Sequence, residues 1–200
     1  EVKFERIKEL QPDIILCNKE ENTREMVQEL EKIAPVHVSD VIKIQDALEL
    51  IVMYGVLFNK IETAASLVNN IQQKISDFRR SPPQKLKVAY FIWRKPWMVA
   101  GSNTFINSLL ELNGWENAFS DREERYSVID LEELNPAGVD LVLLSSEPFP
   151  FKEKHKKEIE ERFKGPIAYT DGEYFSWYGS RLLGAIEYFK QFQKQLSSSL

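Results

Sequence analysis

The sequence predicts an α/β protein with two lobes, whose mostly parallel sheets are joined by one long backbone helix. Short apolar segments typical of buried strands alternate with amphipathic segments on both sides of residues 59–83, and this alternation favours parallel sheets. Residues 59–83 carry one apolar stripe with no Gly and no Pro before Pro82. The expected parts are therefore 1–58, the remainder of the N-terminal lobe, then the helix itself, then 84–200, the C-terminal lobe.

The composition is that of a folded protein with a large core. The chain has 200 residues, of which 43% are hydrophobic and 12% aromatic, enough for one large or two small domains. Its net charge is −5, and the absence of a basic balance argues against a general nucleic-acid-binding protein. The one cysteine excludes an intramolecular disulfide, and no apolar run reaches the roughly 18 residues that a membrane span needs.

The backbone helix is predicted from apolar residues at steps of three and four. These residues are Ile61, Ala64, Ala65, Val68, Ile71, Ile75 and Phe78. A helix of about 20 residues is about 30 Å long, which suits a rigid strut between two lobes. Ser81-Pro82-Pro83 is expected to end it, because Pro lacks the amide N–H and restricts the preceding residue. A helix without internal Pro or Gly bends little, so we expect a small closure on ligand binding.

The first lobe is expected to alternate helices and strands. We expect helices at Phe4–Leu10, Arg24–Ile33 and about 41–58, and strands at Asp13–Cys17 and Val36–Val38. The strand at Asp13–Cys17 is apolar almost throughout, so both of its faces are expected to be buried, with Cys17 as a small core residue. Ser39 or Asp40 is expected to cap the third helix.

The second lobe continues the alternation and is Rossmann-like. We expect strands at 87–93, 139–144 and 167–169, helices at 104–112, 130–134, 152–163 and 180–196, and loops at 94–101, 145–151 and 170–179. Ser102 or Asn103 is expected to open the first of these helices, and Asn113-Gly114 to end it.

An internal similarity relates the two lobes. A helix, a Pro-containing turn and an apolar strand occur twice, and the interval from Glu5 to Glu132 equals that from Asp13 to Asp140. One interpretation is that any helix, turn and buried strand look alike. The other is two lobes of one topology, each with an acidic residue at the same place. On that interpretation the first lobe is incomplete at its N-terminus by about 50 residues, since one βαβ unit takes at least about 30.

Catalytic motifs are not apparent in the sequence. It contains no phosphate-binding glycine loop, dinucleotide fingerprint or zinc-protease motif. Gly101–Thr104 suits either an anion site at a helix start or a simple helix cap. We place His155 on a solvated helix face and take His37 as structural. With a single cysteine besides, no protein-ligated metal site and no resident cofactor are expected.

Aromatic side chains gather in the loops that follow the predicted strands. They are Trp93, Trp97, Tyr126, Phe149, Phe151, Tyr174, Phe175, Trp177 and Tyr178. Ligands of open α/β sheets bind beyond the carboxyl ends of the strands, and aromatic faces with a few polar groups suit a bulky ligand. Arg94 and Lys95 add positive charge for an anionic ligand. The alternative is that these rings pin the loops to the core.

The residues of several segments resemble one known family. Lys87–Phe119, KVAYFIWRKPWMVAGSNTFINSLLELNGWENAF, is similar to the opening of the second lobe in helical-backbone substrate-binding proteins. These proteins serve ABC importers for vitamin B12, ferric siderophores and haem. Leu109–Phe119, with Gly114 and Asn117, is similar to their common signature of a leucine-rich helix followed by Gly and Asn. The resemblance extends to 4–22 and to the long helix, and so covers essentially the whole chain.

The resemblance implies roles for individual residues. Glu5 and Glu132 match the acidic residues that dock on the membrane permease. The loops that contact the ligand in the B12-binding members correspond to residues Asn18, Lys19, Trp93, Arg94, Lys95, Trp97, Met98, Tyr126, Glu173, Tyr174 and Trp177. Tyr126 matches an aromatic position there, whereas Asn18 stands where those members have an aromatic residue.

The leading hypothesis is a monomeric binding protein that acts with an ABC permease. It is expected to capture a metal chelate between its lobes, a ferric siderophore or corrinoid in preference to haem, with the chelator and not the protein holding the iron or cobalt. The family is exported, so we expect a periplasmic or membrane-anchored extracellular protein. The alternatives are a doubly wound enzyme that uses a nucleotide or sugar nucleotide, and a sensor or scaffold of the same fold.

Overall fold

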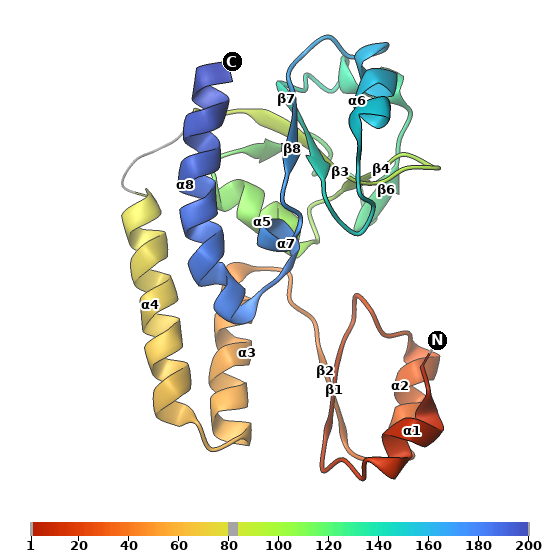
Figure 1. Cartoon of the computed structure of the whole chain (residues 1–200), viewed down its shortest axis with the longest axis vertical. Helices are drawn as coiled ribbons and strands as arrows, with labels where there is room; N and C mark the ends of the chain where they lie inside the picture. The colour runs from red at the N-terminus through yellow and green to blue at the C-terminus, as the bar shows by residue number, and fades with distance from the viewer. Residues whose placement is uncertain (1, 80–83, 200) are drawn as a thin grey trace. The chain divides into compact units, whose positions relative to one another are not determined.

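The computed structural model describes residues 2–79 and 84–199 of the chain. It divides into two compact units, Glu1–Val41 and Ile42–Leu200, and each unit contains one sheet (Figure 1). The predicted α/β class with mostly parallel sheets is confirmed. The division at residues 58 and 83 stays a prediction.

The first unit consists of two helix–strand pairs. These elements are α1 (Phe4–Glu9), β1 (Ile15–Asn18), α2 (Arg24–Leu30) and β2 (Val36–Ser39). The two strands are parallel, with Ile15 opposite Val36. Thr23 begins α2, because its hydroxyl accepts a hydrogen bond from the backbone N–H of Met26 at 3.3 Å, as an N-cap residue does.

Only one of the two faces of β1 is covered within this unit. Cys17 is buried, as predicted, whereas the preceding residue, Leu16, is 43% exposed. Figure 1 places α1 and α2 on the same side of the two strands. The expectation of a strand buried on both faces is therefore wrong for Leu16, because side chains alternate between the faces of a strand and the helices cover one face.

The helix α3 (Ile44–Leu57) begins differently from the prediction. The carboxylate of Asp46 accepts hydrogen bonds from the backbone N–H groups of Ile42 at 2.9 Å and Lys43 at 2.8 Å. Ser39 and Asp40 do not take the N-cap position of α3, which is Lys43. A carboxylate in the first turn satisfies the free N–H groups as well as a cap before it.

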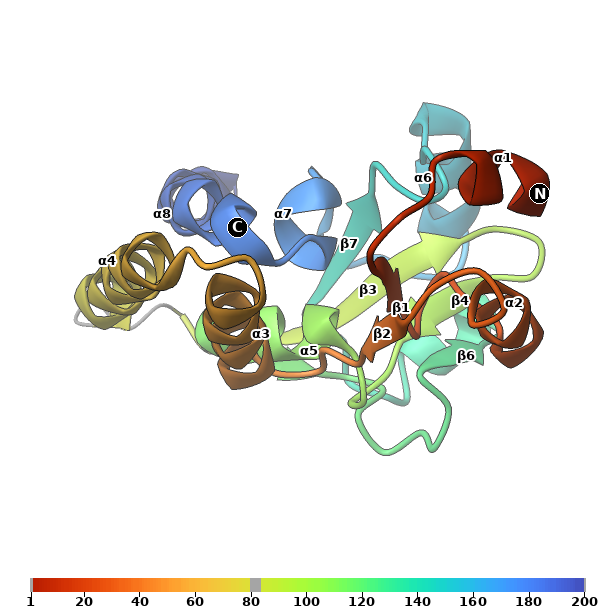
Figure 2. The same cartoon turned by 90° about the horizontal axis from the view of Figure 1, so that it is seen from below.

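The predicted long helix is present as α4 (Ile61–Arg79). Its buried side chains are Ala64, Ile71, Ile75 and Phe78, so most of the predicted stripe faces the protein, although Ile61 is 60% exposed. The expected stop at 81–83 lies outside the described residues. Figure 2 looks nearly along α3, α4 and the last helix, α8 (Leu182–Ser199), and shows them next to one another.

The helices α3 and α4 approach each other closely at one glycine. A Cβ atom added to Gly55 on α3 would lie 2.4 Å from Cβ of Ala64 on α4. The turn between the helices brings the N–H of Lys60 within 2.6 Å of the Gly55 carbonyl. Only a glycine therefore fits here without moving a helix.

The second unit is built around a six-stranded sheet with the order β6-β4-β3-β7-β8, in which β5 also pairs with β3. The strands are β3 (Lys87–Trp93), β4 (Met98–Ala100), β5 (Glu116–Asn117), β6 (Tyr126–Val128), β7 (Leu141–Ser145) and β8 (Ile167–Thr170). The ladders β3–β5, β3–β7 and β7–β8 are parallel. The ladders β3–β4 and β4–β6 are antiparallel.

The predicted loop 94–101 therefore contains a strand, β4. This strand and its neighbour β6 have only three residues each, which is too short for an alternating pattern to be visible. The predicted loop 170–179 likewise contains a four-residue helix, α7 (Glu173–Ser176).

Helices cover both faces of this sheet. Besides α7 and α8 they are α5 (Phe105–Leu112), the 3-10 helix η1 (Leu131–Leu134), α6 (Glu153–Glu160) and the 3-10 helix η2 (Gly179–Arg181). In Figure 1, α5, α7 and α8 lie on one side of β7 and β8, and α6 lies on the other. Phe91 packs with Ile159 of α6 in one core cluster, whereas the ring of Tyr90, the next residue along β3, contacts Phe175 of α7 at 5.2 Å.

Thr104, rather than Ser102 or Asn103, caps α5. Its hydroxyl accepts the N–H of Asn107 at 3.1 Å and donates to the carbonyl of Gly101 at 2.8 Å. The helix ends at Asn113-Gly114 as predicted, with Gly114 at φ 72°. Of the two interpretations of Gly101–Thr104, the structure shows the helix cap.

Candidate ligand-binding site

Three loops of the second unit leave its sheet at the same edge. Because β3, β7 and β8 are parallel neighbours, their carboxyl ends point the same way. The segments 93–97, 145–151 and 170–177 follow these ends. We call the edge formed by these three segments the carboxyl edge, and most of the predicted ligand-binding residues lie on it.

Aromatic rings from two of these loops contact each other. The indole of Trp93 is 40% exposed and meets the ring of Phe149 edge to face at 5.6 Å. Trp97 is half-buried and stacks on Phe151, with 6.1 Å between centroids and 4° between planes. Trp93 thus offers a free face to solvent, whereas Trp97 belongs to the packing beneath it.

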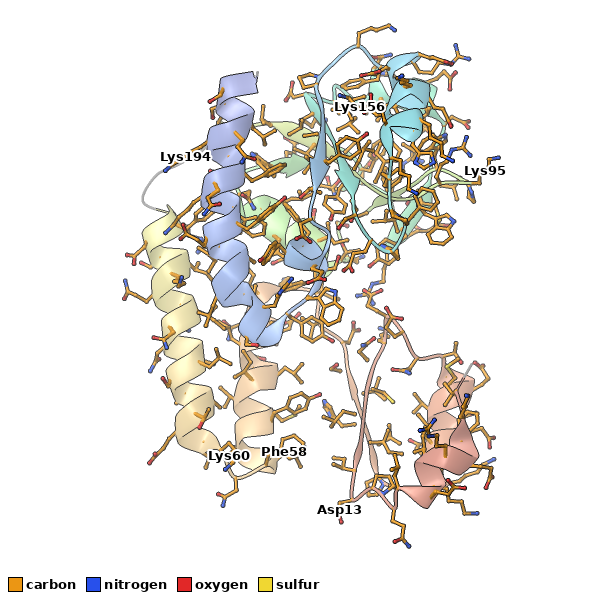
Figure 3. The ribbon with its side chains drawn as sticks, viewed as in Figure 1. Asp13, Phe58, Lys60, Lys95, Lys156 and Lys194 are labelled. Carbon is orange, nitrogen blue, oxygen red and sulfur yellow. The ribbon has the colours of Figure 1, made fainter. Side chains whose placement is uncertain are left out.

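Arg94 is held between two side chains. Its Nε and Nη2 both donate to Oε2 of Glu158 on α6, the first at 2.9 Å, and its guanidinium lies 5.0 Å from the centroid of the Trp97 ring. The Arg94 side chain is only 18% exposed. Lys95, by contrast, lies at the outer end of the β3–β4 turn and points away from the sheet (Figure 3).

A second exposed indole follows β8. Trp177 is 58% exposed, and its Nε1–H donates to Oε1 of Glu147 at 2.7 Å. Glu147 lies in the loop after β7. The last residue of β7, Ser145, accepts a hydrogen bond from the buried Tyr90 hydroxyl at 3.1 Å. Burial raises the pKa of Tyr90 far above its ordinary value, so this hydroxyl stays a neutral donor beneath the loop.

The residues of α7 are engaged with the C-terminal helices. Glu173 forms an ion pair with Arg181, and the Arg181 guanidinium lies 4.6 Å from the centroid of the Tyr174 ring. Tyr174 in turn stacks on Tyr188 of α8 at 4.7 Å and 21°. The loop that carries Trp177 is therefore anchored on both sides.

The structure separates Met98 from Tyr126. Met98 is paired with Trp93 across the β3–β4 ladder, which keeps it beside the carboxyl edge. Tyr126 is paired with Ala100, at the other end of the β4–β6 ladder from Met98.

Asn18 and Lys19 end β1 in the first unit. The Asn18 side chain accepts the N–H of Glu21 at 2.8 Å, so it shapes the turn that follows. Lys19 Nζ lies 2.6 Å from Oδ2 of Asp40. Both predicted residues therefore have partners within their own unit.

The two predicted docking residues are exposed. Glu5 lies on the solvent side of α1, and the Glu132 side chain on η1 is 67% exposed and 3.1 Å from Nε of Arg162. An ion pair this exposed contributes little to stability, so Glu132 is available to a competing cation.

His155 does not lie on a solvated face as predicted. It is 5% exposed, and its ring lies between Phe149 at 5.0 Å and Phe151 at 5.9 Å. Nδ1 accepts the backbone N–H of Lys152 at 3.0 Å. The signal for this was its spacing of four residues from Ile159, which puts both side chains on one face of α6.

Glu147 and Glu158 were absent from the predicted site, and both contact predicted ligand-binding residues. Glu158 is one of many charges on α6, so its sequence context gives no sign that it meets Arg94, which lies 64 positions earlier. No group of three His, Cys, Asp or Glu side chains in the described segments is arranged to hold a metal ion.

A cavity of about 480 Å³ lies at the opposite end of the sheet. Its lining includes Lys87 at the start of β3, Asn117 of β5 and Glu133 of η1. It is therefore separate from the carboxyl edge.

Nowhere between residues 2 and 79 or 84 and 199 is a helix long and apolar enough to cross a membrane.

Solved structures share this fold over nearly the whole chain. The vitamin B12-binding protein BtuF of Vibrio cholerae is 16% identical with a TM-score of 0.76, over 97% of this chain and 78% of that one. The haem-binding protein HutB of Vibrio cholerae is 20% identical with a TM-score of 0.76, over 98% and 81%. An Fe3+-hydroxamate transport protein of Saccharomonospora viridis is 19% identical with a TM-score of 0.72, over 96% and 72%.

At these identities the structural similarity establishes the fold, with its long backbone helix. Family membership is shown by the sequence, because the sequence profile of the periplasmic binding proteins matches residues 1–169. The expectation of a binding protein in place of an enzyme is thereby confirmed, and the nucleotide-using enzyme is set aside. This chain belongs to the periplasmic binding protein family.

Proposed function

We propose that this protein is the substrate-binding component of an ABC importer for a metal chelate, a ferric siderophore or corrinoid ahead of haem. It acts as a monomer outside the cytoplasmic membrane, free in the periplasm or anchored to the membrane, and delivers its ligand to the permease. The family membership supports the transport role. We expect the chelator, and not the protein, to hold the iron or cobalt.

The observation that carries this proposal is the pair of exposed indoles at the carboxyl edge. Trp93 and Trp177 are 40% and 58% exposed, and each is held by a neighbour, Phe149 or Glu147. Large aromatic faces that are fixed before binding lose little side-chain entropy when a ligand covers them. They suit the flat or apolar surface of a bulky chelate.

Tryptophan fluorescence tests the proposal directly. We expect saturable quenching at sub-micromolar concentration when the protein is titrated with the right member of a panel of ferric siderophores, cyanocobalamin and haem. A folded sample that no chelate quenches or binds contradicts the proposal.

Two substitutions show whether the indoles are the contact. Trp93→Ala and Trp177→Ala are each expected to weaken binding by about tenfold or more, since loss of a buried aromatic anchor costs about 2 kcal/mol. Leu10→Ala, at a side chain that is 74% exposed in the first unit, is the control and should leave affinity unchanged.

Glu5 and Glu132 are proposed to dock on cationic pockets of the permease. The double variant Glu5→Ala, Glu132→Ala should lose stimulation of permease ATPase activity and transport while ligand affinity stays the same. The matched control removes two other exposed carboxylates, Glu9 and Glu123, and should retain both. Transport by the first variant at the normal rate excludes these residues as the docking pair, and favours a sensor or scaffold if the wild type also fails to engage a permease.

A further inference from the structure

Two arginines lie at or beside the carboxyl edge of the second unit, Arg94 within it and Arg181 on η2, which follows it in the chain. Each is already neutralised by a carboxylate. Arg94 gives two donors to one oxygen of Glu158 in a pair whose side chains are 18% and 37% exposed. Arg181 is paired with Glu173, with side chains 40% and 45% exposed. Arginine is the side chain that grips anionic groups most firmly because it donates in a rigid fork. Here both forks are engaged within the protein.

Both guanidinium groups are also fixed in place by aromatic rings. Arg94 lies 5.0 Å from the Trp97 centroid, and Arg181 lies 4.6 Å from the Tyr174 centroid. A ligand anion would have to displace a carboxylate and also compete with this cation–π attraction. Neither arginine is therefore poised to receive a negatively charged ligand.

The remaining charges at this edge do not restore a positive site. Glu147 and Asp171 accept hydrogen bonds from Trp177 and from the N–H of Glu173, and neither forms an ion pair with a cation of the described residues. The other cations are solvated lysines. They are Lys95 at the outer end of its turn, and Lys152 and Lys154 on either side of Glu153 at the start of α6. Solvated lysines alternating with carboxylates bind anions weakly.

From these pairings we infer that the chelate bound at this edge is neutral or cationic, and not one with several negative charges. This inference rests on the proposed function and narrows it. The exposed indoles favour such a ligand, since an aromatic face attracts a cation and covers a neutral apolar surface equally well. A hydroxamate-type ferric siderophore or a neutral corrinoid has this character, whereas a ferric tricatecholate or the propionates of haem do not.

Competitive titration of the whole chain tests the charge class. The probes are ferrioxamine B as a cation, ferrichrome and cyanocobalamin as neutral ligands, and ferric enterobactin and haem as anions. We expect at least one neutral or cationic probe to bind about tenfold or more tightly than either anion at physiological salt. Equal or tighter binding of an anion overturns the inference and leaves the proposed function standing. Failure of every probe to bind overturns the proposed function itself.

Glu158→Gln provides the second test, because it leaves the charge of Arg94 uncompensated. The affinity for ferric enterobactin is expected to rise about tenfold, which corresponds to about 1.4 kcal/mol, and this gain should shrink as salt is added. Affinity for ferrichrome should change less than about twofold, because a neutral ligand gains little from the uncompensated charge of Arg94. Circular dichroism and thermal unfolding verify that the variant is folded.

Glu160→Gln is the matched control. It removes the same charge from the same helix, but the partner of Glu160 is Lys156, at 3.8 Å, and not an arginine of the carboxyl edge. An equal response of both variants to ferric enterobactin shows a general charge effect and overturns the role given to the Arg94–Glu158 pair. A tenfold difference between the variants supports it.

Discussion

At the scale of single residues, the imidazole of His155 links α6 to the loop before it. Its Nδ1 accepts the N–H of Lys152, and this requires an unprotonated nitrogen. Burial, followed by the charge of Lys154, lowers the pKa of His155 below its ordinary value, and Arg94 and Lys152 act in the same direction while Glu158 opposes them. The folded protein therefore favours the neutral ring.

This preference predicts how stability depends on pH. Because the pKa of His155 is lower in the folded than in the unfolded chain, the unfolded chain binds more protons between the two values. The contribution of the neutral ring is complete above the unfolded pKa, about 6.5, and declines as the pH falls through that value toward the folded pKa. Urea unfolding between pH 8 and pH 5 measures this decline.

The variant His155→Gln separates this residue from other titrating groups. It should cost about 1–3 kcal/mol at pH 8, since a buried hydrogen bond and ring packing are lost, and its unfolding free energy should vary less between pH 7 and pH 5. His37→Gln is the control, because His37 lies on β2 of the other unit. If the unfolding free energy of His155→Gln falls with pH as steeply as that of the wild type, His155 is not the source of the pH dependence.

Single residues were also where the sequence was least informative. The exposed indoles of Trp93 and Trp177 could be predicted, because they follow apolar strands in a pattern typical of loops. The partners of Arg94 and of Trp177, which are Glu158 and Glu147, could not. Each lies on another loop or helix, 64 and 30 positions away, and only the tertiary structure brings them together.

At the scale of elements, the close contact between α3 and α4 depends on a glycine, Gly55, which has no Cβ atom. Gly55→Ala is expected to lower the free energy of unfolding by about 1–3 kcal/mol, although alanine favours a helix more than glycine does. The reason is the 2.4 Å approach of the new Cβ to Ala64 Cβ. Urea denaturation of the variant measures the loss.

A double-mutant cycle identifies the source of that loss. Ala64→Gly alone costs about 1 kcal/mol through helix propensity, but in the Gly55→Ala background it removes the clashing atom. The two changes together should therefore be less destabilising than their sum by about 1 kcal/mol or more. Simple additivity would place the strain elsewhere, for instance at the Lys60 carbonyl, which lies 3.3 Å from the added Cβ.

Elements were predicted well where they are long or fully apolar. The 19-residue α4 shows five turns of one periodic stripe, and β7 is apolar until Ser145 and buried at every position. The strands β4, β5 and β6 were missed because they have only two or three residues. Such strands form because a neighbouring strand offers a free edge, β3 for β4 and β5 and β4 for β6, and not because of local sequence preference.

At the scale of the whole molecule, the two units differ in how much core they bury. All five residues of β7 are buried, and β3 has five consecutive buried residues. In the first unit, each of the two described strands has one buried residue, Cys17 on β1 and Ser39 on β2. A two-stranded sheet without a second covered face is marginal in water.

Amide hydrogen exchange should reflect the difference in buried core between the two units. We expect the amides of β1 and β2 to exchange about a hundredfold faster or more than those of β7, because local opening of the first unit costs less than global unfolding. Exchange followed by mass spectrometry of peptides measures both units in one sample. Similar protection in β1 and β7 would show that the chain unfolds as one cooperative body.

The single thiol of the chain lies where that opening can be timed. Cys17 is in the middle of β1 and 7% exposed, and burial raises its pKa, so its thiolate is scarce while the strand is closed. Alkylation in the native protein must wait for β1 to separate from its surroundings. The rate at which an added maleimide alkylates Cys17 therefore reports how often the first unit opens locally. The measurement needs no engineered cysteine, because the reactive thiol is native.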